Sequence, residues 1–103
     1  MLLMAIMTYP GTSAATVAKK GIEILTNDPY PEYIKRDYYY ALTGDGIKTY
    51  VVADIEQGKE QEGLLNIMNR LVKLSSIEGF NAILEPLFTI EEAYASIDME
   101  SPV

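Results

Sequence analysis

The chain has 103 residues, 49% of them hydrophobic, and its fifteen acidic and eight basic side chains give a net charge of −7. A chain of this length buries roughly 60–65% of its unfolded surface, so we expect a single domain in residues 1–97, followed by a flexible tail in residues 98–103. The acidic balance would repel a phosphate backbone, which argues against nucleic acid as a partner.

Two residue types that carry much of enzyme chemistry are missing, because the chain contains neither cysteine nor histidine. Without cysteine there can be no disulfide, no thiolate nucleophile and no thiolate-bound zinc or iron–sulfur cluster. Without histidine the usual general base near neutral pH and the commonest metal ligand are absent. We therefore expect no metal and no cofactor, and we lean toward a protein that is not an enzyme.

The first strand is predicted over Leu2–Tyr9, which is apolar at almost every position and ends at Pro10 and Gly11. Such a continuous run predicts a strand that is buried on both faces and central in its sheet. It is too short for a signal peptide and lacks the cationic segment that precedes one. No other stretch approaches the ~18 apolar residues of a membrane span, so we expect no membrane partner and a cytoplasmic location.

A first helix is predicted from about residue 14 to residue 25. Thr12 or Ser13 stands where a hydroxyl side chain can cap the first free N–H groups. Gly21 would weaken this helix by about 1 kcal/mol relative to alanine, unless close packing requires a glycine there. Apolar residues at spacings of three and four predict one buried stripe, made of Ala14 or Ala15, Ala18, Ile22 and Leu25.

The stretch from Tyr33 to Glu56 has the pattern of a β-hairpin. Two runs rich in Tyr, Val, Ile and Thr flank Thr43–Gly46, whose glycines permit the positive φ of tight turns. The three candidate loops differ by an even number of residues, so all of them put the same side chains on the same face. We expect one face to join the core and the other, which is amphipathic, to need a cover. The core face is Tyr38, Tyr40, Leu42, Ile47, Thr49, Val51, Ala53 and Ile55; the other is Asp37, Tyr39, Ala41, Thr43, Lys48, Tyr50, Val52 and Asp54.

A second helix is predicted over residues 60–74. It is acidic at its start and basic at its end, which is the order that the helix dipole favours. Its buried stripe is predicted to consist of Leu64, Ile67 or Met68, Leu71 and Leu74.

A last strand is predicted over Phe80–Phe88, where the residues of its two faces alternate. Pro86 cannot donate a hydrogen bond to a neighbouring strand, so this strand should lie at a sheet edge. Thr89 and Glu92 then match a capping box, in which each residue binds the backbone N–H of the other. The pattern predicts a short C-terminal helix.

The predicted order is strand, helix, strand, strand, helix, strand and short helix, which is the βαββαβ unit of ferredoxin-like α+β folds. Right-handed crossovers place the first and third strands at the centre of a four-stranded antiparallel sheet, with both long helices on one face. The other face stays open in a monomer, and monomers rarely expose so much apolar surface. We therefore expect a homodimer through this face, whose residues are Tyr39, Tyr50, Val52, Ile83, Leu87 and one side of the first strand.

The chain resembles the dimeric α+β barrel superfamily, in which two ferredoxin-like protomers pack sheet against sheet. The resemblance covers residues 1–97 and rests on the element order and on the pattern Ile83–Phe88 leading into Thr89–Ala93, which is similar to the end of small uncharacterised members. The superfamily contains cofactorless monooxygenases, isomerases, haem-degrading enzymes and amino-acid-sensing modules. Several of its enzymes use a histidine that this chain lacks, so the resemblance implies a fold and a dimer but no catalytic residue.

Three tyrosines are the candidate ligand-binding residues. Tyr38, Tyr40 and Tyr9 would together form an aromatic wall with hydroxyl donors, which suits a small apolar or aromatic ligand. The alternative is that they are strand-forming residues whose hydroxyl groups are hydrogen-bonded at the rim of the core.

Two carboxylates are candidate acids or bases. Asp54 is expected near Asp37 across the hairpin, and two close carboxylates can raise the pKa of one of them. Glu85, beside Asn81 on the last strand, can serve as a general base if it is buried. The alternatives are exposed, solvated hairpin ends for the aspartates and a polar contact at the dimer rim for Glu85.

The expected function is a non-catalytic small-molecule-binding or sensing homodimer. One alternative is a cofactorless oxygenase or isomerase that acts on an aromatic-like small molecule, and another is a structural or protein-interaction module. A cavity between sheet and helices is needed for the first two, whereas an assembly module should fill that space with side chains. An empty cavity in which a tyrosine and a carboxylate converge would favour catalysis.

Overall fold

The computed structural model describes all 103 residues, and it contains four strands and three α-helices. None of the helices has the length and the apolar character that crossing a membrane requires. In chain order the elements are β1 (Leu2–Tyr9), a 3₁₀ turn (Gly11–Ser13), α1 (Ala14–Asn27), β2 (Ile34–Thr43), β3 (Gly46–Ile55), α2 (Glu60–Leu74), β4 (Asn81–Leu87) and α3 (Ile90–Ala95).

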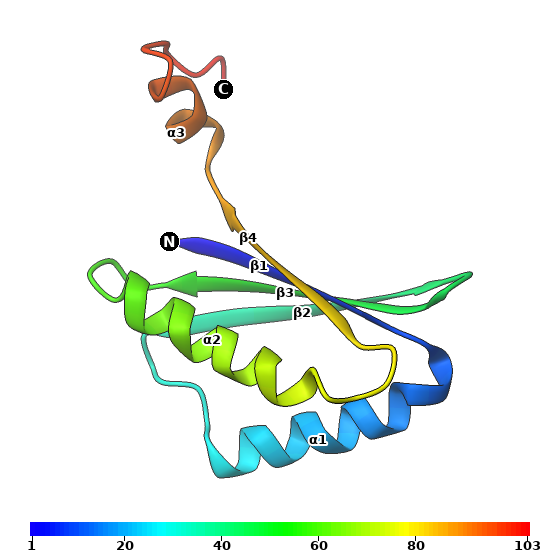
Figure 1. Cartoon of the computed structure of the whole chain (residues 1–103). Helices are drawn as coiled ribbons and strands as arrows, with labels where there is room; N and C mark the ends of the chain where they lie inside the picture. Colours follow the sequence, from blue (N-terminus) through cyan, green and yellow to red (C-terminus); the bar gives the residue numbers. More distant parts are fainter.

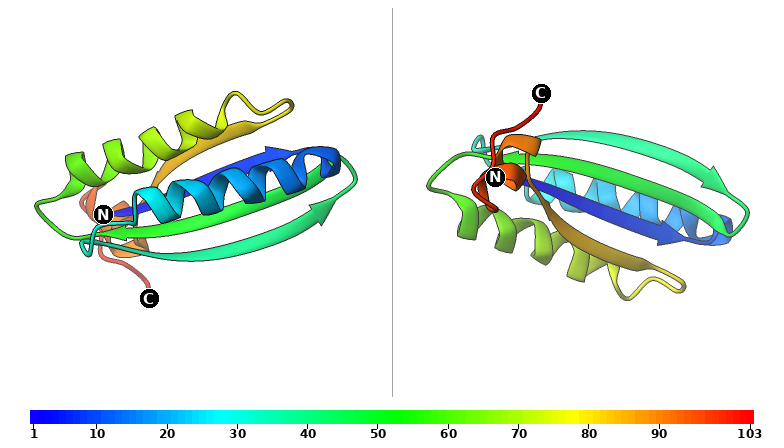
Figure 2. Two further views of the ribbon diagram at one scale, coloured as in Figure 1. Left: turned by 90° about the horizontal axis from the view of Figure 1, so that it is seen from below. Right: turned by 90° about the horizontal axis from the view of Figure 1, so that it is seen from above.

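The four strands form one antiparallel sheet in the order β2-β3-β1-β4 (Figure 1). Helices α1 and α2 lie side by side on one face of this sheet (Figure 2). The predicted ferredoxin-like α+β fold is therefore confirmed, with β1 and β3 at the centre. Pro86 lies in β4 at the sheet edge, as the missing N–H donor requires.

Strand β1 connects the two halves of the sheet, because it pairs with β3 on one side and with β4 on the other. Leu3 and Ala5 face the helices and are buried. Ile6 faces the opposite side, where it lies between Tyr50 of β3 and Ile83 of β4. The apolar character of both faces of this strand thus matches its central position.

The β2–β3 hairpin has the predicted faces. Tyr38 lies opposite Val51 on the side of the helices, whereas Tyr39 lies opposite Tyr50 on the other side. Since side chains alternate along each strand, these two pairs settle the orientation of the remaining residues.

The hairpin closes through the two-residue loop Gly44-Asp45, between the paired residues Thr43 and Gly46. The positive φ falls on Gly46, at 138°, which is one of the two glycines of the predicted turn. A Cβ atom at this position would collide with the carbonyl oxygen of Tyr9. The glycine therefore lets the hairpin end approach the end of β1.

The two predicted helix caps have different outcomes. The prediction of a cap at Thr12 or Ser13 is wrong, because a 3₁₀ turn leads into α1 and the Ser13 hydroxyl donates instead to the carbonyl oxygen of Glu78 at 2.9 Å. The capping box of α3 is confirmed: Thr89 N–H donates to the Glu92 carboxylate at 2.9 Å, and Glu92 N–H donates to the Thr89 hydroxyl at 3.1 Å. The hydrogen bond with the Thr89 backbone lowers the pKa of the Glu92 carboxyl most, and the hydrogen bond with the Thr89 side chain lowers it further.

The helices pack on faces that are partly rotated from the predicted stripes. In α1 the buried residues are Val17 and Ile24, whereas Ile22 of the predicted stripe is exposed. In α2 Ile67 and Leu74 are buried as predicted. Helix α1 has apolar residues on two adjacent faces, so its periodicity could not distinguish them, and only packing against the sheet and α2 decides which face is buried.

The core consists of two clusters of buried side chains under the helices, and Leu71 of α2 packs against both. One cluster is Leu3, Ile34, Ala53, Ile55 and Ile67, and the other is Tyr9, Val17, Ile24, Leu74 and Phe80.

Gly63 of α2 packs so closely on β3 that an alanine Cβ would lie 2.6 Å from Cγ2 of Ile55. Ile55 is completely buried, and its Cδ1 and Cγ1 atoms would also lie only 2.8 and 3.0 Å from the new Cβ. We expect Gly63→Ala to lower the free energy of unfolding by about 1–2 kcal/mol, because overpacking outweighs the gain in helix propensity. Urea denaturation followed by circular dichroism measures the change.

The matched control is Gly21→Ala in α1, where no atom lies within 4 Å of the position that a Cβ would occupy. This substitution should raise the free energy of unfolding by about 0.5–1 kcal/mol, because alanine restricts the unfolded chain more than glycine does. Equal effects of the two substitutions would contradict the close contact at Gly63.

Candidate functional site: a cavity between the helices and the sheet

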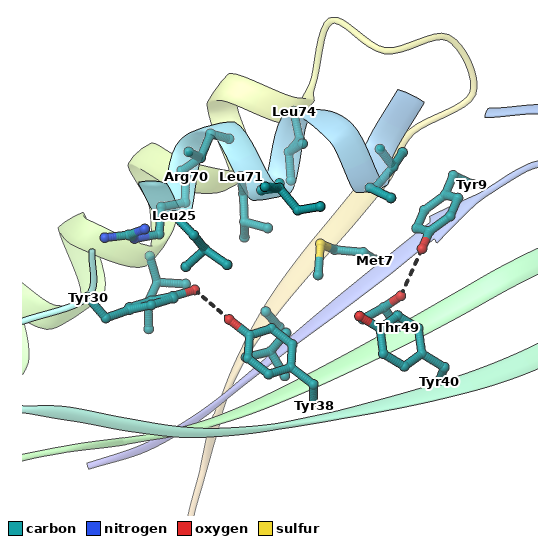
Figure 3. A pocket seen from close by; sticks show the side chains of 18 residues that line it. Met7, Tyr9, Leu25, Tyr30, Tyr38, Tyr40, Thr49, Arg70, Leu71 and Leu74 are labelled. Carbon is teal, nitrogen blue, oxygen red and sulfur yellow. Dashed lines mark hydrogen bonds between the residues drawn. The ribbon is translucent and has the colours of Figure 1, made fainter. Parts of the chain in front are cut away.

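A cavity of about 340 Å³ lies between α1, α2 and the face of the sheet that the helices cover (Figure 3). Of the 18 residues that line it, 15 are hydrophobic. Small residues leave this space open, notably Ala5 on β1 and Ala18 and Gly21 on α1. An apolar hollow therefore remains under the helices, and residues of both core clusters line it.

The three tyrosines predicted to bind a ligand all line this cavity. Tyr9 is buried, and its hydroxyl lies 3.1 Å from Oγ1 of Thr49 (Figure 3). Tyr38 and Tyr40 face the helices as predicted, but they are 39% and 69% exposed and are not core residues. Their strand, β2, is an edge strand with no neighbour to cover its outer side. That these tyrosines bind a ligand stays a prediction.

Arg70 of α2 is a lining residue that the sequence reasoning missed, and it is only 5% exposed. Its Nε donates to Oδ1 of Asn66 at 2.8 Å, whereas the buried Nη1 and Nη2 make no hydrogen bond. The carboxylate of Asp28 lies 3.7 Å from Nη2. A signal was present in the sequence, because Arg70 stands three residues after Ile67 and four before Leu74, on the buried stripe.

Tyr30, in the loop between α1 and β2, is stacked between two guanidinium groups. The Cζ atoms of Arg70 and Arg36 lie 3.8 Å and 3.9 Å from the centre of its ring. Two planar groups this close to one ring centre must occupy its opposite faces. Nε of Arg36 also donates to the Tyr38 hydroxyl at 3.3 Å, and that hydroxyl donates to the Tyr30 oxygen at 3.4 Å. These four side chains form one connected group at one end of the cavity.

The Tyr30 hydroxyl is held in its protonated form. Burial raises its pKa, and the hydrogen bond with Tyr38 raises it further, against the smaller opposing effect of the two arginines. Tyr30 can therefore donate a hydrogen bond at neutral pH, but it has no tendency to take a proton from a ligand.

The two candidate acid or base residues lie outside the cavity. Asp54 is paired with Leu2 and Glu85 with Met4, on the side of the sheet opposite the helices. No carboxylate is among the residues that line the cavity. The structure also contains no group of three or more acidic side chains that could hold a metal ion. The three predicted ligand-binding tyrosines and the two carboxylates are thus on opposite faces of the sheet, so they do not form a catalytic pair.

The face of the sheet opposite the helices is covered by neither long helix, and its centre is apolar (Figure 2). Ile6 lies near its centre, flanked by Tyr50 and Ile83, and Ile83 is exposed. The residues predicted to form a dimer all lie on this face: Tyr39, Tyr50, Val52, Ile83 and Leu87.

Comparisons with known proteins bear on the fold and not on the function. No protein-family model matches the chain, and no curated protein matches its sequence. Among solved structures, a de novo designed protein, Foldit4, matches with a TM-score of 0.50 and 8% sequence identity, over 84% of this chain and 96% of that chain. This likeness supports the ferredoxin-like arrangement alone. The resemblance to the dimeric α+β barrel superfamily stays a prediction.

We expect Thr49→Val to lower the free energy of unfolding by about 1–2 kcal/mol, because it leaves the buried Tyr9 hydroxyl without its hydrogen-bond partner. Tyr9→Phe combined with Thr49→Val removes both partners and should cost less than the sum of the two single substitutions. Urea denaturation of the four proteins gives the coupling energy, for which we expect about 1 kcal/mol. A coupling near zero would show that the two hydroxyl groups do not interact.

Proposed function

We propose that the chain is a non-catalytic small-molecule-binding or sensing module that acts as a homodimer of the dimeric α+β barrel type. The observation that carries the proposal is the cavity of about 340 Å³ with its hydrophobic lining and few polar groups. Ligand pockets in proteins have volumes of roughly 300–1,000 Å³ and combine an apolar wall with a small number of polar side chains. A small apolar or aromatic molecule fits this description.

The alternatives have less support. A cofactorless oxygenase or isomerase needs an acid or base beside its substrate. The lining contains no carboxylate, and the raised pKa of Tyr30 keeps that hydroxyl protonated. A purely structural module would be expected to fill the space with larger side chains, whereas Ala5, Ala18 and Gly21 leave it open.

Gly21→Leu tests the proposal, because its new side chain would extend into the cavity from the inner face of α1. Wild-type protein should bind the neutral fluorescent probe N-phenyl-1-naphthylamine, and Gly21→Leu should weaken this binding by about tenfold or more, since the leucine occupies the space of the probe. Fluorescence titration measures both affinities.

The control is Ala15→Leu, which adds the same side chain at an exposed position of the same helix. It should leave the affinity for the probe unchanged. Absence of probe binding to the wild type, or equal affinities of the wild type and Gly21→Leu, would contradict a ligand site in this cavity.

Two apolar surfaces support the homodimer. One is the open face of the sheet, and the other is the C-terminal arm, which we define as residues 88–99. The arm extends from the end of β4 and places α3 on the side of the sheet opposite α1 and α2 (Figures 1 and 2). Phe88, Ile97 and Met99 of the arm are exposed.

A second copy of the chain suits both surfaces. A two-fold axis through the open face would bring two identical apolar faces together, and each arm would project toward the partner. Such an arrangement removes from water the apolar side chains that a monomer leaves uncovered.

Light scattering at micromolar concentration should therefore give about twice the protomer mass of 11.5 kDa. Ile6→Glu, at the centre of the open face, should shift the mass to that of one protomer, because a buried unpaired carboxylate disfavours the contact. Ala15→Glu, on the exposed side of α1, is the matched control and should remain dimeric. A wild type that scatters as a monomer would overturn the proposed assembly.

A further inference from the structure

We infer that the ligand of this cavity carries an anionic head group, with a carboxylate on an apolar body as the chemical class, and that Arg70 binds this head group. The inference rests on the proposed function, because it names the kind of molecule that the same cavity takes. Its basis is a buried cation with unused hydrogen-bond donors in an otherwise apolar lining.

The guanidinium of Arg70 has five N–H donors, of which only the one on Nε has an acceptor. Nη1 and Nη2 are closed off from solvent, so water does not satisfy them. A charged donor that is buried without a hydrogen-bond acceptor destabilises a protein, whereas a carboxylate accepts two parallel bonds from one guanidinium. A ligand carboxylate therefore supplies the hydrogen-bond acceptors that no protein group provides for Nη1 and Nη2.

Asp28 forms an ion pair with Arg70 but no hydrogen bond, because its Oδ2 lies 3.7 Å from Nη2. The Asp28 side chain is half exposed to water, so this pair leaves the Nη1 and Nη2 donors without an acceptor. No carboxylate competes for Arg70 from within the cavity. The protein as a whole carries a net charge of −7. The two arginines on the Tyr30 ring therefore form a local positive charge within an acidic protein.

Tyr30 covers the guanidinium from one side and connects it to Arg36 on the other. A carboxylate reaches Nη1 and Nη2 when the Tyr30 ring moves aside, and it then lies between two cations instead of an aromatic ring. The loop that carries Tyr30 joins α1 to β2, so this movement requires no change in a helix or strand. In Figure 3, Arg70 and Tyr30 lie at the same end of the cavity, which leaves the rest of the apolar space for the body of the ligand.

The test compares two competitors that share one body and differ in the head group. Both 2-naphthoate and 2-naphthylmethanol are titrated against protein that has bound N-phenyl-1-naphthylamine. Wild-type protein should bind the naphthoate about tenfold or more tightly than the alcohol, as expected for hydrogen bonds to a charged group. Arg70→Met should remove this preference while it leaves the affinity for the alcohol unchanged.

Lys73→Met is the matched control, because it removes one positive charge from an exposed position on the same helix. It should keep the preference for naphthoate. Arg70→Met should also unfold at the same temperature as the unliganded wild type or at a higher one, since it removes a buried guanidinium whose Nη1 and Nη2 make no hydrogen bond. If Arg70→Met does not fold, Arg70→Lys serves instead and should reduce the preference, because lysine keeps the charge but not the two parallel donors.

The outcomes separate this inference from the proposed function. Equal wild-type affinities for naphthoate and the alcohol overturn the inference and leave the binding function standing. A preference that survives the change at Arg70, with a lowered unfolding temperature, assigns Arg70 a structural role and overturns the inference as well. Failure of the wild type to bind the probe or either competitor overturns the proposed function itself.

Discussion

The position of β1 between β3 and β4 is the constraint on which the rest of the structure depends. Its side chains are apolar on both faces, so each face needs a cover, and only one receives the two helices. On the covered face, Leu3 packs in the same core cluster as Ile67 of α2, and the buried Ala5 lines the cavity. On the other face, Ile6 sits among apolar neighbours that no element of the same chain covers. The fold and the proposed assembly thus have one common origin in this strand.

The cavity results from the small size of several residues that line the space between the covered face of the sheet and the helices. Ala5, Ala18 and Gly21 stand where larger side chains would fill the cavity. Each missing side chain gives up dispersion contacts and apolar burial. Arg70 adds a further cost, because its Nη1 and Nη2 are buried without hydrogen-bond partners. An open apolar space beside a guanidinium with free hydrogen-bond donors is the feature on which the proposed binding function rests.

The sequence predicted the position of a residue in the fold where the pattern that determines this position lies within one strand or helix. Alternation in the hairpin placed Tyr38 and Tyr39 on opposite faces, and Pro86 placed β4 at an edge, because both rules act within one strand. Tyr9, Tyr38 and Tyr40 were chosen for their chemistry and do line the cavity. The stack of Arg36, Tyr30 and Arg70 could not be foreseen, since it joins β2, a loop and α2. Its one local trace was a charged residue on the buried stripe of α2.

The sequence by itself determined the order of the elements, the two faces of the sheet and the capping box at Thr89, because hydrophobic periodicity and short-range hydrogen bonds are properties of neighbouring residues. Tertiary structure alone decided which apolar face of α1 is buried, since Val17 and Ile22 are equally suited to burial until the sheet and α2 are in place. It also decided that space remains beside Gly21 and that Arg70 lies within the protein. Cavities and buried charges depend on the fit between elements that are distant in the chain.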